Sequence, residues 1–330
     1  MKTWDSSVTV GIFGVVSAII TSVTAIVVAL IKKYNPSSKS PRSKPKKRNY
    51  NYRLAQVYEE QNDYPKALEH YLQAAEEYED DTLDQAMAFK AAGIMCQTLA
   101  EYEDAIKLYL QAQAIYVDDP KANQLDLATI YNNLAVVYKD QGKKDQGKYN
   151  EALRWYRKAL AIKEKVLGKE HPDTAITYNN IAAVYGTQGE YDDALEWFFK
   201  ALTVYEKALG KEHPNTATTY NNIGEVHKHK GEYPNALEWY FKALAVSEKV
   251  LGKEHQSTAI TYENIATVYD VQEKHDDAMK LHLRAYRVFL DKLGKDHPYT
   301  KECVDNMRID YEATGATQPF DDWLDAQLNS

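Results

Sequence analysis

A phrase of 19 residues recurs along this chain at a spacing of 42 residues. It begins at Leu167 as LGKEHPDTAITYNNIAAVY, at Leu209 as LGKEHPNTATTYNNIGEVH and at Leu251 as LGKEHQSTAITYENIATVY, and a shorter copy, LGKDHPYT, begins at Leu293. A catalytic motif is normally present once, whereas a fixed period of about 20–50 residues is typical of stacked structural repeats. The spacing therefore predicts a repeat protein, whose length is set by the number of repeats.

Each repeat contains two stretches in which apolar or small side chains recur at the spacing of an α-helix. After Leu167 these side chains are Tyr178, Ile181, Ala182 and Tyr185 in the first stretch and Ala194, Phe198, Ala201 and Leu202 in the second. The alanines allow two helices to approach closely, and the aromatic rings fill the space that remains. The pattern predicts a helix, a tight turn and a second helix in every repeat.

Two further features predict where these helices begin and end. Gly189 and Gly231 lie between the paired stretches, where a helix C-terminus favours a residue in the left-handed conformation. Threonines precede each first stretch and are predicted N-caps: Thr174, Thr216, Thr258 and Thr300. We therefore interpret LGKEHP as a connector that ends one helix and starts the next.

The order of large, small and aromatic residues resembles the tetratricopeptide repeat (TPR). The residues that carry the resemblance are Tyr178, Ala182, Tyr185, Gly189, Tyr191, Ala194, Phe198 and Ala201, and in the next repeat Tyr220, Gly224, Gly231, Tyr233, Ala236, Tyr240 and Ala243. The 42-residue period, the LGKEHP linker and the paired asparagines are similar to the kinesin-light-chain subtype. The resemblance covers residues 50–315. It implies an all-α fold, a right-handed TPR superhelix of about six helix-turn-helix repeats plus a capping helix, over residues 50–316.

The third repeat is longer than the others. Tyr131 and Tyr178 are separated by 47 residues, and the excess is visible as DQGKK followed at once by DQGKY. A turn tolerates insertion better than a helix does. The sequence therefore predicts a longer loop with intact helices on both sides.

The N-terminal region predicts a membrane anchor. Residues 8–31 contain no charged side chain, and a helix of this length spans roughly 36 Å, enough to cross a bilayer core of about 30 Å. The alternative is a cleaved signal peptide, whose apolar region is shorter, about 7–15 residues. The basic residues that follow place the repeats in the cytoplasm and residues 1–7 outside it. The repeats are thus predicted to follow a single transmembrane helix in the chain, and the sequence does not identify the membrane.

Charge is distributed unevenly along the chain. Residues 1–50 hold nine basic residues and one acidic residue, a net charge of +8, whereas residues 51–330 hold 31 basic and 47 acidic residues, a net charge of −16. The Pro-, Ser- and Lys-rich segment 32–49 predicts a disordered neck that contacts anionic lipid headgroups. The predicted contact residues are Lys32, Lys33, Lys44, Lys46, Lys47 and Arg48. The acidic repeats argue against nucleic acid as a partner, and Ser40 before Pro41 is a candidate phosphorylation site.

Asparagines in the first helices are the candidate binding residues. The TPR resemblance implies that first helices line the concave surface, and an amide both donates and accepts hydrogen bonds to an extended peptide. The predicted groove residues are Asn132, Asn133, Asn179, Asn180, Asn221, Asn222, Asn264 and Asn306. The alternative is that these amides satisfy neighbouring turns. Kinesin light chains favour acidic, tryptophan-containing cargo and need basic grooves, whereas the charges around this column are mixed.

Neither an active site nor a cofactor or metal site is predicted. The chain has no Gly-rich phosphate loop, no HExxH and no nucleophile elbow. The four connector histidines recur 42 residues apart without a neighbouring cysteine, whereas zinc needs three or four clustered ligands: His171, His213, His255 and His297. Cys96 and Cys303 form no CxxC pair.

The acidic C-terminal tail, residues 317–330, has two interpretations. Its residues Phe320, Trp323 and Leu324 predict a short helix that seals the last repeat. Alternatively, the tail occupies the groove of its own or a neighbouring chain. The predicted function is a membrane-anchored, non-enzymatic scaffold that binds a protein or peptide segment in its concave groove. The alternatives are a cargo or targeting adaptor of the kinesin-light-chain type and a peptide receptor at an organelle membrane. The partner and the oligomeric state, including a homo-oligomer, stay open.

Overall fold

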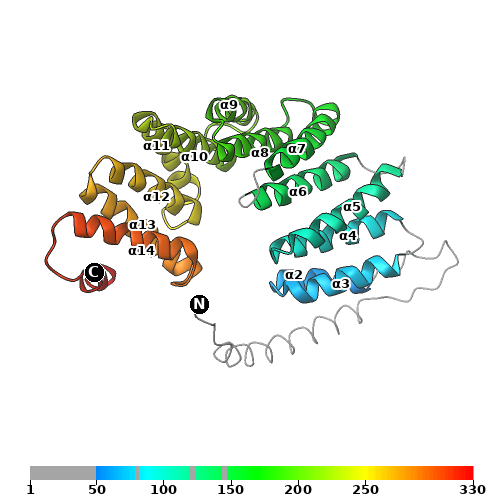
Figure 1. Cartoon of the computed structure of the whole chain (residues 1–330), viewed down its shortest axis with the longest axis horizontal. Helices are drawn as coiled ribbons and strands as arrows, with labels where there is room; N and C mark the ends of the chain where they lie inside the picture. The colour runs from blue at the N-terminus through cyan, green and yellow to red at the C-terminus, as the bar shows by residue number, and fades with distance from the viewer. Residues whose placement is uncertain (1–49, 79–81, 119–123, 143–146, 330) are drawn as a thin grey trace, which may run out of the picture. The chain divides into compact units, whose positions relative to one another are not determined.

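The structure, a computed structural model, describes residues 50–78, 82–118, 124–142 and 147–329. These residues form helices α2 to α15 and no strand (Figure 1). The first helices of the repeats are α2 (Tyr50–Glu60), α4 (Thr82–Thr98), α6 (Gln124–Gly142), α8 (Pro172–Gln188), α10 (Pro214–His229) and α12 (Gln256–Val271). The second helices are α3 (Tyr64–Glu77), α5 (Tyr102–Asp118), α7 (Gly147–Val166), α9 (Tyr191–Ala208), α11 (Tyr233–Val250) and α13 (His275–Leu293). Two more helices, α14 (Pro298–Ala313) and α15 (Phe320–Leu328), follow.

This order confirms the predicted all-α fold of six helix pairs followed by a capping helix. The predicted lengthening of the third repeat lies between α6 and α7, at residues 143–146, which are outside the described residues. The helices on either side of it are continuous, as predicted.

The predicted transmembrane helix and the single-pass membrane localisation are corrected. Among the residues that the structure describes, no helix is both long and apolar enough to cross a membrane. The longer helices are amphipathic: α7, for example, has Arg154 and Arg157 exposed beside buried apolar residues, and such charged faces are costly in a bilayer. The predicted span, residues 8–31, lies outside the described residues, as do residues 1–7 and the neck 32–49.

The chain divides into two units, one ending at Val137 and the other beginning at Tyr138, within α6. In the N-terminal unit, α2, α3, α4 and α5 pack in sequence, each on the next. In the C-terminal unit, each helix from α7 to α15 packs on its neighbour in the chain. The first helices α8, α10 and α12 and the capping helix α14 also contact one another in that order. The first helices of the C-terminal unit therefore form a continuous row.

Small residues bring the paired helices together, as the sequence predicts. Ala182 on α8 and Ala194 on α9 are fully buried and pack with Phe198 and Tyr220 in one apolar cluster. Successive repeats are also joined by polar contacts: the Tyr178 hydroxyl donates to Glu164 at 2.7 Å, and its equivalent Tyr220 donates to Glu206. The stack is thus held by interdigitated side chains and by a repeated tyrosine–glutamate hydrogen bond.

The repeated LGKEHP phrase is a helix connector in which histidine, not threonine, is the N-cap. In α10 the Nδ1 atom of His213 accepts a hydrogen bond from the backbone N–H of Asn215 at 3.1 Å, and His171, His255 and His297 cap their helices in the same way. The predicted threonine caps are therefore wrong. Each threonine lies inside the first turn, and the Thr216 hydroxyl donates to the carbonyl of Gly210 at 2.9 Å. The left-handed glycines predicted between the paired helices are confirmed, with φ of 80° at Gly189 and 76° at Gly231.

Replacing Thr216 by valine is expected to destabilise the C-terminal unit by about 1 kcal/mol. Valine keeps the shape of threonine at this fully buried position, but it leaves the partly buried Gly210 carbonyl without its donor, and an unsatisfied buried acceptor costs about 1–3 kcal/mol. Urea unfolding of the variant measures the loss. Thr218→Val is the matched control, because Thr218 is exposed on the same helix; equal stability of the two variants would contradict the role of the Thr216 hydroxyl.

The C-terminal tail seals the last repeat, which is the first of the two interpretations that the sequence allows. Phe320 and Leu324 on α15 are buried in a cluster with Tyr311 of α14. The Trp323 ring lies 4.9 Å from the Tyr311 ring. Arg308 pairs with Asp321 at 2.9 Å across the same contact. The apolar face of α15 thus covers the end of the stack.

Candidate binding groove

The row of first helices in the C-terminal unit is hollowed between its members. A cavity of about 310 Å³ lies over α10, α12 and α14. It is lined by Asn221, Asn222, Glu225, Lys228, Ile260, Glu263, Asn264, Thr267, Phe289, Tyr299, Glu302 and Asn306. A second cavity of about 220 Å³ adjoins it between α10 and α12, and a third of about 400 Å³ lies between α8 and α10. Asn222 lines all three, and we call the three cavities together the groove.

Four of the eight predicted asparagines line the groove: Asn221, Asn222, Asn264 and Asn306. All eight are half-buried. Asn179 and Asn180 lie on α8 and do not line the three cavities, and Asn132 and Asn133 belong to the N-terminal unit. Within the C-terminal unit, the groove therefore gathers four of the six predicted asparagines.

Most of the groove asparagines already bond to a neighbouring repeat. Asn264 donates to Asn221 at 3.2 Å, and Asn306 donates to Glu263 at 3.0 Å. Outside the groove, Asn179 accepts from Thr219 at 3.4 Å. These contacts join side chains of neighbouring helices, whereas the alternative from the sequence had the amides satisfy turns. Asn222 is different, because within the described residues its amide has no hydrogen-bond partner.

The charged side chains of the groove differ in how fully they are paired. Glu225 accepts from Tyr240 at 2.6 Å and pairs with Lys228 at 2.9 Å and His229 at 3.0 Å. Burial would raise the pKa of Glu225, but Lys228 and the Tyr240 hydroxyl outweigh it and lower the pKa. Glu302 is exposed and has no ion pair among the described residues. The groove thus presents one free amide and one free carboxylate.

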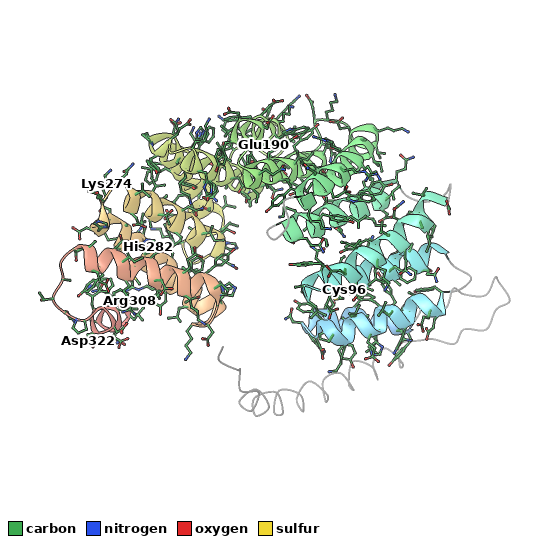
Figure 2. All side chains as sticks on the ribbon, viewed as in Figure 1. Cys96, Glu190, Lys274, His282, Arg308 and Asp322 are labelled. Atoms are coloured by element: carbon green, nitrogen blue, oxygen red, sulfur yellow. The ribbon has the colours of Figure 1, made fainter. Side chains whose placement is uncertain are left out.

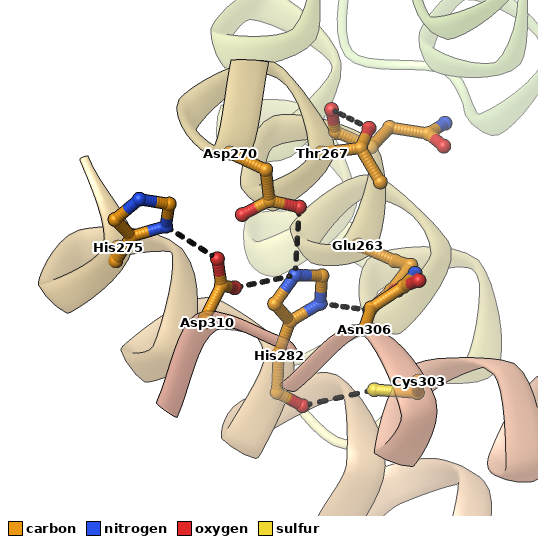
Figure 3. Close-up of polar contacts among 9 residues, drawn as sticks. Glu263, Thr267, Asp270, His275, His282, Cys303, Asn306 and Asp310 are labelled. Atoms are coloured by element: carbon orange, nitrogen blue, oxygen red, sulfur yellow. Dashed lines mark hydrogen bonds and ion pairs between the residues drawn. The ribbon is translucent and has the colours of Figure 1, made fainter. Parts of the chain in front are cut away.

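A buried polar cluster lies behind the groove, and sequence reasoning did not predict it. His282 on α13 is fully buried. Its Nδ1 lies 2.8 Å from Glu263, and its Nε2 lies 3.2 Å from Asp270 and 3.4 Å from Asp310 (Figure 3). Asp310 also bonds to His275 at 2.8 Å. Burial alone would lower the pKa of His282, but hydrogen bonds to Asp270 and Glu263 raise it to about 9. Burial raises the pKa of Asp310 to about 6.

The repeat register contains a signal that could have revealed this cluster. His282 is 42 residues after Tyr240 and 84 after Phe198, and those two side chains are buried aromatic members of the core. A histidine in a position that otherwise holds an apolar ring needs polar partners. Figure 2 labels His282 in the C-terminal unit. It lies on α13, and the neighbouring helices α12 and α14 supply the carboxylates.

Some predicted residues cannot be placed. The membrane-surface set (Lys32, Lys33, Lys44, Lys46, Lys47 and Arg48) and the candidate phosphorylation site Ser40 lie outside the described residues. The connector histidines are helix caps and do not approach one another as ligands would: among the described residues, the groups that could hold a metal ion all contain His282.

Comparisons with known proteins agree with this architecture. The sequence matches the family model of the tetratricopeptide repeat over residues 48–118, 126–207, 184–240 and 215–291. It matches no curated protein. Among solved structures, it is similar to BtubC (BKLC) from P. vanneervenii, with a TM-score of 0.54 and 19% identity over 78% of this chain and 94% of that chain.

Two other solved structures share the fold. Aspartyl phosphate phosphatase F from Bacillus subtilis has a TM-score of 0.57 and 16% identity, over 81% of this chain and 70% of that chain. A putative kinesin light chain from P. anserina with nearly identical TPR-like repeats has a TM-score of 0.51 and 20% identity, over 63% of this chain and 97% of that chain. At these identities the similarity shows a common fold alone.

Proposed function

The chain belongs to the tetratricopeptide repeat family, and from this premise we propose that it is a non-enzymatic scaffold that binds an extended segment of a partner protein in its groove. Stacked helix pairs present a long surface that suits such a segment. The observation that carries the proposal is the Asn222 amide. It lines all three cavities of the groove and has no partner among the described residues.

A free amide in this position fits the backbone of an extended peptide. In an extended chain the N–H and the C=O of one residue face the same side, and the Asn222 side chain offers the complementary acceptor and donor. Neighbouring amides are held in place by the bonds from Asn264 to Asn221 and from Asn306 to Glu263. The surface is therefore already ordered before a partner binds, which lowers the entropic cost of binding.

The free carboxylate indicates the side-chain chemistry of the partner. Glu302 is exposed at one edge of the groove, next to the exposed ring of Tyr299. Lys228, the basic side chain of the same cavity, is already paired with Glu225. We therefore propose a segment that carries Lys or Arg opposite Glu302. This surface does not suit the acidic, tryptophan-containing cargo that the kinesin-light-chain resemblance implies, because no unpaired base faces the cavity over α10, α12 and α14 among the described residues.

Asn222→Ala is expected to weaken peptide binding about tenfold or more without lowering stability. Two hydrogen bonds to the N–H and C=O of one peptide residue are lost, at about 0.5–1.5 kcal/mol each, whereas no bond within the described chain is lost. The measurement is a screen of the full chain against an array of extended peptides that differ in charge. Fluorescence anisotropy with the best peptide then gives the affinity of each variant.

Asn215→Ala is the matched control, since Asn215 lies on the same helix with its side chain exposed outside the groove. Glu302→Gln is expected to reduce the preference for basic over acidic peptides. The proposal fails if no peptide binds, or if Asn222→Ala and Asn215→Ala bind the best peptide equally well.

A further inference from the structure

We propose that Asp270, His282 and Asp310 bind one zinc ion that joins the last helix pair to the capping helix. The three residues come from α12, α13 and α14, so a single ion would tie three consecutive helices together. These three residues do not line the groove, although Glu263, which bonds to His282, does, and the proposal does not depend on the proposed function.

The spacing of the ligand atoms fits tetrahedral zinc. The Nε2 atom of His282 lies 3.2 Å from Asp270 Oδ2 and 3.4 Å from Asp310 Oδ2, and the three ligand atoms lie within 4.8 Å of one another. With zinc bonds of about 2.0–2.1 Å, two ligand atoms of a tetrahedron are about 3.3 Å apart. A histidine and two carboxylates leave the fourth position to water.

The other ring nitrogen of His282 has the partner that a zinc ligand needs. Its Nδ1 lies 2.8 Å from Glu263, which also accepts from Asn306 at 3.0 Å. A ligating histidine commonly donates its second N–H to a carboxylate, which fixes the tautomer and the ring orientation. With Glu263 as that acceptor, loss of the Nε2 proton would leave a lone pair that faces Asp270 and Asp310. Zinc would displace a proton from Nε2 on binding, and this proton would be released to solvent.

Two oxygen atoms of the cluster have no hydrogen bond, although one of them, Asp310 Oδ2, lies 3.4 Å from His282 Nε2. The hydrogen-bond donors of the cluster are the two ring nitrogens of His282, the His275 ring and the Asn306 amide. Their hydrogen bonds reach only Glu263, one oxygen of Asp270 and one oxygen of Asp310. Asp270 Oδ1 and Asp310 Oδ2 are left buried without a hydrogen bond. The Asp310 side chain is only 2% exposed. Buried acceptors without a donor are costly, and a cation between these carboxylates removes that cost.

The neighbouring trio of Glu263, His282 and Cys303 also lies within ligand distance, but it is the weaker candidate. The Cys303 thiol points at the carbonyl of His282, at 3.1 Å, and burial raises its pKa. Glu263 is also occupied, because it accepts from Asn306 at 3.0 Å, so two of these three ligands already have hydrogen-bond partners. Asp270 also gives an ion a path from solvent, because its side chain is 27% exposed.

The test is a titration of the full chain, freed of metal by a chelator, with Co²⁺ and then Zn²⁺. We expect one Co²⁺ per chain with visible d–d absorption, displacement by Zn²⁺, and a rise in Tm with zinc concentration. Asp270→Asn and Asp310→Asn are each expected to weaken the affinity by 100-fold or more, and Glu263→Gln by about 10–100-fold. Asp277→Asn, an exposed position on α13, is expected to leave the affinity unchanged.

Asp270→Asn keeps the test decisive if Asp310→Asn does not fold, because Asp270 is the partly exposed member of the set. Circular dichroism confirms that each variant is folded. Absence of Co²⁺ absorption in the full chain overturns the proposal. Equal affinity of the full chain and Asp270→Asn also overturns it, since the ion would then be held by histidines elsewhere on the surface.

Discussion

The His282→Phe variant is expected to lose about 3–5 kcal/mol of folding stability in the presence of a chelator. Phenylalanine fits the shape of this position, because Phe198 and Tyr240 occupy it in the two preceding repeats. The loss comes from charge: Glu263, Asp270 and Asp310 face the ring of His282 at 2.8 to 3.4 Å. Removing one partner of a buried ionic cluster leaves the others uncompensated, at a cost of about 3–5 kcal/mol. Urea unfolding of the full chain gives the measurement.

Two further variants separate charge from packing. Tyr240→Phe changes the same position of the preceding repeat and removes only the hydroxyl that donates to Glu225, so we expect a loss of about 1 kcal/mol. Adding Asp310→Asn to His282→Phe is expected to recover part of the stability, because one buried charge is removed. If His282→Phe is as stable as the original chain, the carboxylates do not depend on the imidazole and our description of the cluster is wrong.

The same glycine-to-alanine change is expected to have opposite effects on two neighbouring helices. A Cβ atom on Gly224 would lie 2.7 Å from Cδ1 of the Tyr240 ring. That ring is fully buried and held by its bond to Glu225, so it cannot move aside freely. Overpacking of this kind costs about 1–3 kcal/mol. At Gly186 the nearest atoms to a Cβ are 3.9 Å away, and there alanine gains up to about 1 kcal/mol of helix propensity.

Thermal and urea unfolding of Gly224→Ala and Gly186→Ala measure this difference directly. We expect Gly186→Ala to be at least as stable as the original chain and Gly224→Ala to be less stable. A Gly224→Ala variant that gained stability would show that Tyr240 can shift, and that the close packing of α10 on α11 is not required at this position.

The helix pairs could be predicted from the sequence because the spacing of small and aromatic residues that forms each pair lies within one repeat. The spacing of Ala182, Ala194 and Phe198 predicts the close packing that is found between α8 and α9. One local assignment, the N-cap of each first helix, was wrong. Thr216 has the chemistry of an N-cap, but the cap is His213, three residues earlier; both side chains can accept a backbone hydrogen bond, and the position of the first helical turn decides between them.

The candidate site could be predicted only in part. Sequence register places Asn222, Asn264 and Asn306 in one column, and the three line the cavity over α10, α12 and α14. Register does not reveal which amides are already bonded, because Asn264 reaches a residue 43 positions earlier in the chain. The asymmetry that leaves Asn222 free arises from contacts between repeats.

The sequence by itself determined the period, the helix pairs and their number, because these follow from local spacing and from residues that end or begin helices. Only the tertiary structure decided which polar groups meet. Glu263, His282 and Asp310 belong to three different helices, and each alone is an ordinary polar residue in an amphipathic pattern. Stacking removes them from water together, and the resulting need for compensating partners gives the cluster its chemistry.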